Sequence, residues 1–302
     1  MNRRSCSRWS FALVVTLTGL GYAGYAQVVN PADKQRPETK PEAVSEAVHV
    51  GSWELPAITV TGEQPAVLRE EDKVGTYGQP RWTAHRRFPR TRIYVVPEGK
   101  FEFEFWTRAD VPKDDGPTEI QTMYEVEMGL PHRFQLDLYL VARTTGDTET
   151  YLDQKFEVRY AFADWGKIPG NPTLYVEYAL IDRGDDKVEI KLLLGDELAP
   201  RWHWGVNAVC ESVLTGERDR EYAVTAGLSY TVVDEKLSIG IEAEGAIADT
   251  KEYRGSFSKA LLVGPSLQYK PLPNMHIDIA PLIGVTDDSP AAKAFLNIGW
   301  EF

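Results

Sequence analysis

The sequence predicts an all-β fold, a transmembrane antiparallel β-barrel of about 12 strands that follows a disordered N-terminal segment. Three observations lead to this prediction. The chain begins with the layout of a secretory signal, residues from 99 onward alternate between apolar and polar, and the last strand ends in an aromatic residue. Each alternating stretch is roughly nine to fourteen residues long, which is enough to cross a bilayer when the strand is tilted.

The part of the chain before the barrel divides into three segments. Residues 1–26 carry arginines, then an apolar run, then small residues, which is the three-part pattern of a cleaved signal peptide. Residues 27–75 are rich in proline and glutamate and predict a disordered periplasmic linker. Residues 76–98 are basic and could enter the barrel as a plug. The candidate plug residues are Arg81, Arg86, Arg87, Arg90 and Arg92.

The barrel is predicted over residues 99–302, where period-two alternation begins. In the stretch "KFEFEFWTRADV", Phe101, Phe103 and Phe105 share one face and Glu102 and Glu104 share the other. Such strict alternation indicates a strand with one apolar and one polar face. The pattern recurs between turn residues up to the last strand, which gives an even number of strands and places both ends of the barrel in the periplasm.

Two folds fit these strands, a membrane barrel and a soluble sandwich or lipocalin-like barrel. In a soluble barrel the apolar face points inward, and about 12 strands of large apolar residues would overfill the interior. In a membrane barrel that face contacts lipid, and aromatic residues gather near the strand ends. The mean hydropathy of −0.33 does not separate the two, because alternating residues cancel in the average. The prediction is a membrane barrel with outer-membrane lipid as its surroundings.

The closing sequence "FLNIGWEF" resembles the C-terminal signature of Gram-negative outer-membrane β-barrels. This resemblance implies a bacterial outer-membrane location and recognition of Phe302 and Trp300 by the barrel-assembly machinery. From Gly99 to Phe302 the chain is similar to the broad class of small outer-membrane channels that includes phenol-degradation transporters. The resemblance rests on architecture and on the last strand, so it implies porin-like transport without a particular solute.

The polar face of the strands is mostly acidic, and the formal net charge of −12 excludes nucleic acid as a partner. Three interpretations of this lumen stay open. A water-filled lumen would favour cations, the arginines of residues 76–98 could neutralise it as a plug, or the charges could pair across strands in a filled interior. The candidate lumen and selectivity residues are Glu104, Glu125, Glu127, Asp137, Glu157, Arg159, Glu177, His203, Glu242, Glu244 and Asp278.

The sequence predicts neither catalytic residues nor a cofactor. It has no GxSxG motif, and no serine accompanies His203 or His276 at a recognisable nucleophile spacing. A metal site that joins His203 to Glu211 or Asp278 would need side chains to converge, and none is predicted. Cys210 falls on the apolar face and is interpreted as a small apolar residue.

The function predicted first is passage of small solutes through an acidic lumen. One alternative is a closed structural or interaction barrel that anchors a periplasmic segment to a partner. The other is an outer-membrane lipid-modifying enzyme. The sequence favours a protein that is not an enzyme.

Overall fold

The computed structural model describes residues 69–146, 150–216 and 218–302. They belong to one compact unit, Glu63–Phe302. The predicted signal peptide and residues 27–68 of the predicted linker lie outside the described residues. Within the described ranges, none of the helices has the length and apolar character needed to cross a membrane.

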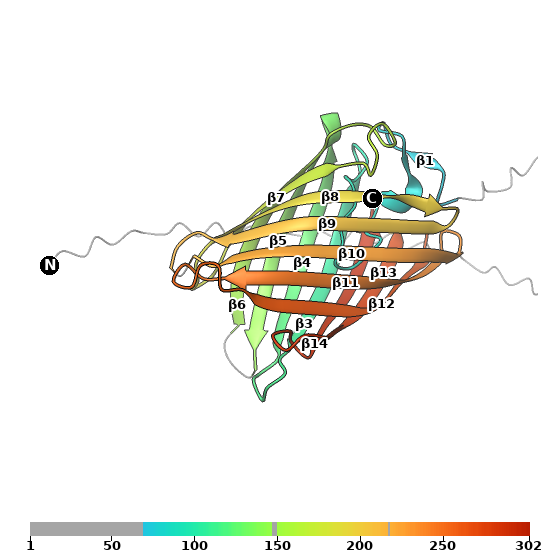
Figure 1. The fold of residues 1–302 in the computed structure, drawn as a ribbon. Helices are drawn as coiled ribbons and strands as arrows, with labels where there is room; N and C mark the ends of the chain where they lie inside the picture. Colours follow the sequence, from blue (N-terminus) through green and yellow to red (C-terminus); the bar gives the residue numbers. More distant parts are fainter. Residues whose placement is uncertain (1–68, 147–149, 217) are drawn as a thin grey trace, which may run out of the picture. The chain divides into compact units, whose positions relative to one another are not determined.

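Twelve antiparallel strands close into a barrel in which each strand pairs with its neighbour in sequence and β14 pairs with β3 (Figure 1). This confirms the predicted all-β barrel. A single-turn 3₁₀ helix, η2 (Pro131–Arg133), joins β4 to β5. The strands are β3 (Phe101–Val111), β4 (Glu119–Leu130), β5 (Phe134–Thr145), β6 (Thr150–Ala161), β7 (Thr173–Leu180), β8 (Lys187–Ala199), β9 (Trp202–Val213), β10 (Arg220–Val233), β11 (Leu237–Asp249), β12 (Ser258–Leu272), β13 (Met275–Gly284) and β14 (Ala292–Glu301).

The apolar face of the strands is the outer face. Along β3, for example, Phe103 is 41% exposed whereas Glu104 is fully buried. Large apolar side chains such as Leu140 and Ile241 are exposed in the same way on the other strands. Exposed apolar side chains around a closed barrel are stable in lipid rather than in water, so the structure decides between the two folds in favour of the membrane barrel.

Two strands continue into stretches whose composition is typical of turns. The stretches "GDELAP" and "KPLPN" look like turns because they contain proline and charged residues. In the structure β8 continues to Ala199, since Asp196 and Glu197 remain paired with β9. β12 continues to Leu272, which pairs with Met275 across a two-residue turn. Pairing with the neighbouring strand outweighs the local turn preference.

We call the barrel end that holds Phe101 and Phe302 the terminal end, and the opposite end the distal end. Residues 69–98, the inner segment, begin at the terminal end with β1 (Lys73–Val74), β2 (Gln79–Pro80) and the single-turn helix η1 (Arg81–Thr83). The chain then enters the lumen and returns to β3 (cyan in Figure 1), and Arg86 and Arg92 on its two arms both reach Glu104. Residues 69–75, which the sequence assigned to the linker, also contact the barrel, because the Glu70 amide donates to Asp234 Oδ1 at 2.9 Å.

The inner segment carries its own apolar core. Trp82 and Tyr94 are buried and both pack edge-on against Trp165, with ring centroids 5.6 and 5.2 Å apart. Trp165 lies in the connection between β6 and β7, so this loop covers the inner segment at the terminal end. Apolar packing and hydrogen bonds together hold the segment, for instance the bond from the Val96 amide to Gln135 Oε1 at 2.6 Å.

A row of glycines on the barrel wall makes room for the tip of the inner segment. Gly195, Gly205 and Gly227 lie opposite one another on β8, β9 and β10. Phe88 is fully buried against this row, and a Cβ added to Gly227 would lie only 2.6 Å from Phe88 Cδ1. A side chain at this position would therefore overlap the Phe88 ring.

We predict that Gly227→Val displaces the inner segment, because overpacking costs about 1–3 kcal/mol. Trypsin should then cleave at the buried arginines of residues 86–92 roughly tenfold faster than in the wild-type protein. Adding Phe88→Ala should restore protection by removing the overlapping ring. Gly245→Val is the matched control, because a Cβ there would meet only Leu261 Cδ1 at 3.8 Å. Equal cleavage of all variants would contradict this packing.

Candidate functional site: the charged lumen

Nine consecutive strands, β14 and then β3 to β10, each place one carboxylate at directly opposed positions of the sheet. We call this set the acidic row. It begins at the terminal end on β14 and β3 and, as the strands tilt, reaches the distal end on β9 and β10. Its members are Glu301, Glu102, Glu127, Asp137, Glu157, Glu177, Glu189, Glu211 and Glu221.

Like charges that face each other across strands destabilise a sheet, so the acidic row requires counter-charges. The barrel wall supplies many of them. Arg159 bridges the row by binding Asp137 at 3.0 Å and Glu157 at 2.5 Å. Towards the distal end, lysines provide the counter-charges. The pairs are Lys155 with Glu177 at 3.0 Å, Lys191 with Glu189 at 2.6 Å and Lys187 with Glu211 at 2.8 Å.

The inner segment supplies the counter-charges at the centre of the lumen. Arg86 Nε donates to both carboxylate oxygens of Glu104, at 2.8 and 3.0 Å. Arg92 Nη2 donates to Glu125 Oε1 at 2.8 Å, and its Nη1 lies 3.0 Å from Glu127 Oε1. All five side chains are buried. We call these residues the arginine cluster, and it fills the lumen between its two ends.

The other three predicted plug arginines also bind the barrel. Arg81 Nε donates to Glu235 at 2.8 Å, and the Arg90 guanidinium binds Glu244. The Arg90 amide donates to Glu242 at 3.0 Å. Arg87 Nε donates to Ser229 Oγ of β10 at 3.0 Å, so each of the five predicted plug arginines contacts the barrel.

Electrostatics favour charged guanidinium groups in the arginine cluster. Burial by itself lowers the pKa of Arg86, and Arg92 adds to this, but the carboxylates of Glu104 and Glu125 outweigh both and raise the pKa. Arg86 therefore stays charged at any physiological pH. A buried charge that loses its partner is strongly destabilising, so the cluster links the inner segment firmly to β3 and β4.

Two cavities lie on either side of the arginine cluster. The distal cavity has a volume of about 220 Å³, and Arg86 and Arg92 of the cluster form part of its lining. The terminal cavity, about 140 Å³, is lined by Arg81, Glu102 and Glu301 among others. A third space of only about 20 Å³ is lined by Arg86, Arg92 and Glu127 of the cluster and by other residues of the inner segment. The acidic row contributes side chains to all three spaces, from Glu301 at one end to Glu221 at the other.

The distal cavity is richer in basic than in acidic groups. Its wall carries five basic and five acidic side chains, and the inner segment adds Arg86, Arg90 and Arg92. The inner segment thus gives the cavity its excess of positive charge while it covers the carboxylates of Glu104, Glu125 and Glu127. The wall residues are Arg108, Lys155, Lys187, Lys191 and Lys293, with Glu177, Glu189, Glu211, Glu221 and Glu244.

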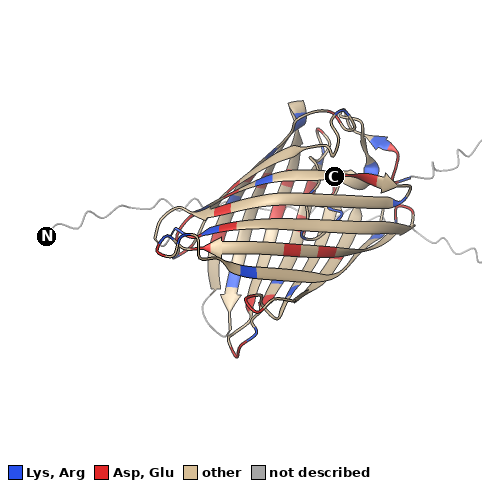
Figure 2. Ribbon diagram, in the orientation of Figure 1, with Lys and Arg blue, Asp and Glu red and all other residues tan. Residues whose placement is uncertain are grey.

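The eleven predicted lumen residues are all buried, and they belong to strands of the barrel. Figure 2 shows acidic and basic residues distributed along the barrel strands. Not all of them come together. Asp278 contacts His276, whereas His203 lies 2.9 Å from Arg87 and packs on the Trp82 ring instead of joining Glu211 or Asp278. The sequence pattern gives no indication of the pairing of Lys155 with Glu177 or of the role of Asn207. That amide exchanges two hydrogen bonds with the Arg92 backbone.

Solved structures are similar to this chain. An outer membrane channel from Pseudomonas putida F1 is 11% identical, with a TM-score of 0.51 over 69% of this chain and 97% of that chain. The NanC porin is 14% identical, with a TM-score of 0.48 over 67% of this chain and 98% of that chain. The KdgM porin is 10% identical, with a TM-score of 0.47 over 67% of this chain and 99% of that chain.

The chain has the fold of an outer-membrane β-barrel. The predicted bacterial outer-membrane location agrees with this fold and with the apolar exterior. At such low identity the likeness establishes the fold and gives no information on solutes. A scan of protein-family models and a search of curated proteins find no match.

We predict that acid weakens the binding of the inner segment through His85. Burial and the neighbouring charge of Lys270 lower the pKa of His85 to about 4. The Glu301 carboxylate, 3.2 Å from the ring, opposes this shift through its hydrogen bond and its charge. An exposed histidine titrates near pH 6.5, so the bound segment is disfavoured as the pH falls from about 6.5 towards 4. At pH 5 the bound segment is less stable than at neutral pH by about 2 kcal/mol through this shift.

The measurement is urea unfolding in detergent micelles at pH 7.5 and pH 5, for the wild-type protein and for His85→Gln. The variant should lose less stability on acidification, by about 2 kcal/mol. Burial raises the pKa of Glu70, so protonation of Glu70 favours the folded protein as the pH falls. This effect opposes that of His85, but it is equal in both proteins. The same pH dependence in both would mean that His85 is not the sensitive group.

Proposed function

We propose that the protein is a channel for small polar solutes, and that the inner segment must move before a solute can pass. The observation that carries the proposal is the pair of cavities on either side of the arginine cluster, each lined in part by carboxylates of the acidic row. The acidic row runs beside both cavities and supplies a polar lining over the whole length of the lumen. The P. putida protein that shares the fold is an outer membrane channel, which supports the same interpretation.

Movement of the inner segment would change the charge of the path. While the segment is bound, its arginines make the distal cavity basic. Once it leaves, Glu104, Glu125 and Glu127 face the lumen without their partners, and the wall becomes mostly acidic. We therefore propose that the open channel prefers cations or basic solutes, because rings of carboxylates favour cations in narrow pores.

A closed structural barrel is the second candidate, because the inner segment contacts the wall through five arginines and an apolar core. In that case residues 69–98 would stay in the lumen, and the barrel would anchor the preceding chain at the membrane. The two candidates differ in a single property, whether the inner segment moves.

An enzyme is the weakest of the three candidates. His203 and Ser229 lie opposite each other on β9 and β10, in a position where a base and a nucleophile could meet. Arg87 occupies both groups, with its Nη2 2.9 Å from His203 Nδ1 and its Nε donating to Ser229 Oγ at 3.0 Å. A histidine beside a charged guanidinium is a poor general base, so we propose that the protein is not an enzyme.

The proposed partners follow from the exterior. Phe302 is 70% exposed and Trp300 is 39% exposed. Both lie at the terminal end, where we propose that the barrel-assembly machinery binds them and that this end faces the periplasm. The apolar outer band is proposed to contact outer-membrane lipid.

A disulfide across the lumen tests the channel directly. Thr91 Oγ1 of the inner segment lies 3.1 Å from Thr225 Oγ1 of β10, so Thr91→Cys with Thr225→Cys should link the two when oxidised. The link is made in a background in which Cys6 and Cys210 are alanine. In planar bilayers the reduced variant should conduct, and oxidation should abolish the current.

Arg86→Gln serves as the opposite perturbation, because it weakens the arginine cluster and should lengthen the openings. The reversal potential across a KCl gradient should show cation preference in the open state. Equal currents in the reduced and oxidised forms would refute the gating role of the inner segment. Absence of current in the wild-type protein and in Arg86→Gln would favour the closed barrel.

A further inference from the structure

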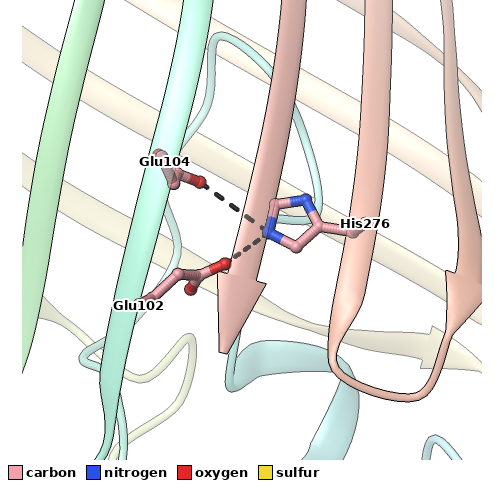
Figure 3. A group of neighbouring side chains, drawn as sticks. All are labelled: Glu102, Glu104 and His276. Atoms are coloured by element: carbon pink, nitrogen blue, oxygen red, sulfur yellow. Dashed lines mark hydrogen bonds and ion pairs between the residues drawn. The ribbon is translucent and has the colours of Figure 1, made fainter. Parts of the chain in front are cut away.

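His276 is fully buried on the lumen face of β13, close to the terminal end. Its Nδ1 lies 2.5 Å from Asp278 Oδ2, and its Nε2 contacts Glu102 Oε1 on β3. Glu104 Oε1 lies 3.9 Å from the same Nε2. One imidazole nitrogen and two carboxylates thus converge on one point of the lumen (Figure 3).

The sheet brings these groups together across an intervening strand. β14 lies between β13 and β3, and its Gly299 is opposite both His276 and Glu104. A Cβ added to Gly299 would lie 1.9 Å from His276 Nε2 and 2.5 Å from Glu102 Oε1. Only glycine at this position lets the two side chains meet over β14.

Polar atoms next to this cluster lack partners. Asn297, opposite Asp278 on β14, is 1% exposed, and neither its Oδ1 nor its Nδ2 makes a hydrogen bond within the described part of the chain. The same holds for Glu102 Oε2 and Asp278 Oδ1. Buried polar atoms are nearly always paired, so this group points to a ligand that would satisfy them.

The donor set fits a divalent transition metal. Imidazole nitrogen together with carboxylate oxygen suits Zn²⁺ and its neighbours, whereas Mg²⁺ and Ca²⁺ prefer oxygen alone. Histidines that bind metals usually donate the other ring N–H to a carboxylate, and Asp278 is placed to accept from His276 Nδ1. In that tautomer Nε2 carries no proton, and it would face the ion together with Glu102 and Glu104.

We propose that His276, Glu102 and Glu104 form a binding site for a first-row divalent cation, with Asp278 orienting the imidazole. Asn297 supplies a further oxygen beside the site. A divalent ion would also offset part of the negative charge that the neighbouring carboxylates gather at this end of the acidic row. This site does not depend on the proposed channel function.

The test uses the full-length protein in detergent, stripped with a chelator and titrated with ZnCl₂ in an isothermal calorimeter. We expect saturable binding of one Zn²⁺ per chain that persists in excess Mg²⁺. Asp278→Asn should weaken binding by about 10–100-fold, because it removes the group that orients the imidazole. His276→Gln should weaken it at least as much.

His203→Gln is the matched control, since this second buried lumen histidine contacts Arg87 and lies outside the proposed site. Its zinc affinity should equal that of the wild-type protein. If His276→Gln fails to fold, Co²⁺ bound to the wild-type protein provides a second measurement, because coordination by His276 gives visible absorption bands that Asp278→Asn should shift. Absence of saturable binding in the wild-type protein, or equal zinc affinity in His276→Gln, would overturn the proposal.

Discussion

Pairing between arginines of the inner segment and carboxylates of the lumen is the interaction on which the rest of the structure depends. Glu104, Glu125 and Glu127 lie side by side on β3 and β4 and have almost no access to water. Buried carboxylates in this number are unstable unless positive charges satisfy them. Arg86 and Arg92 reach them from the inner segment, so an acidic barrel and its basic N-terminal neighbour form one electrostatic unit.

The same pairing explains how the interior is divided. Because the arginine cluster fills the middle of the lumen, it separates the distal cavity from the terminal cavity. The acidic row nevertheless continues past the cluster, and wall residues such as Arg159 and Lys191 balance its other members. Under the proposed channel function, such an interior would be closed while the segment is bound and would become a continuous polar path when the segment leaves.

The sequence was sufficient to predict the barrel, its inner and outer faces and the lumen position of residues such as Glu125. Strict alternation fixes which face a residue occupies, and a row of phenylalanines opposite glutamates leaves little ambiguity about lipid and lumen.

The register of the strands and the long-range partners of the lumen residues could not be predicted from this alternation. Period two does not say which residue of the next strand lies opposite, so the continuity of the acidic row could not be seen. The contact of His276 with Glu102 joins residues on β13 and β3 across the barrel closure and depends on Gly299 between them. Likewise, the fit of Phe88 against Gly227 depends on the path of the inner segment, for which the sequence has no periodic signal.

A double-mutant cycle on Arg86 and Glu104, measured by urea unfolding in detergent micelles, tests the central claim most directly. Arg86→Met alone and Glu104→Leu alone should each cost roughly 3–5 kcal/mol, since each leaves a buried charge without its main partner. The double variant should be far more stable than the sum of the two losses predicts. Two small losses that simply add would contradict the claim that this pairing holds the inner segment in the lumen.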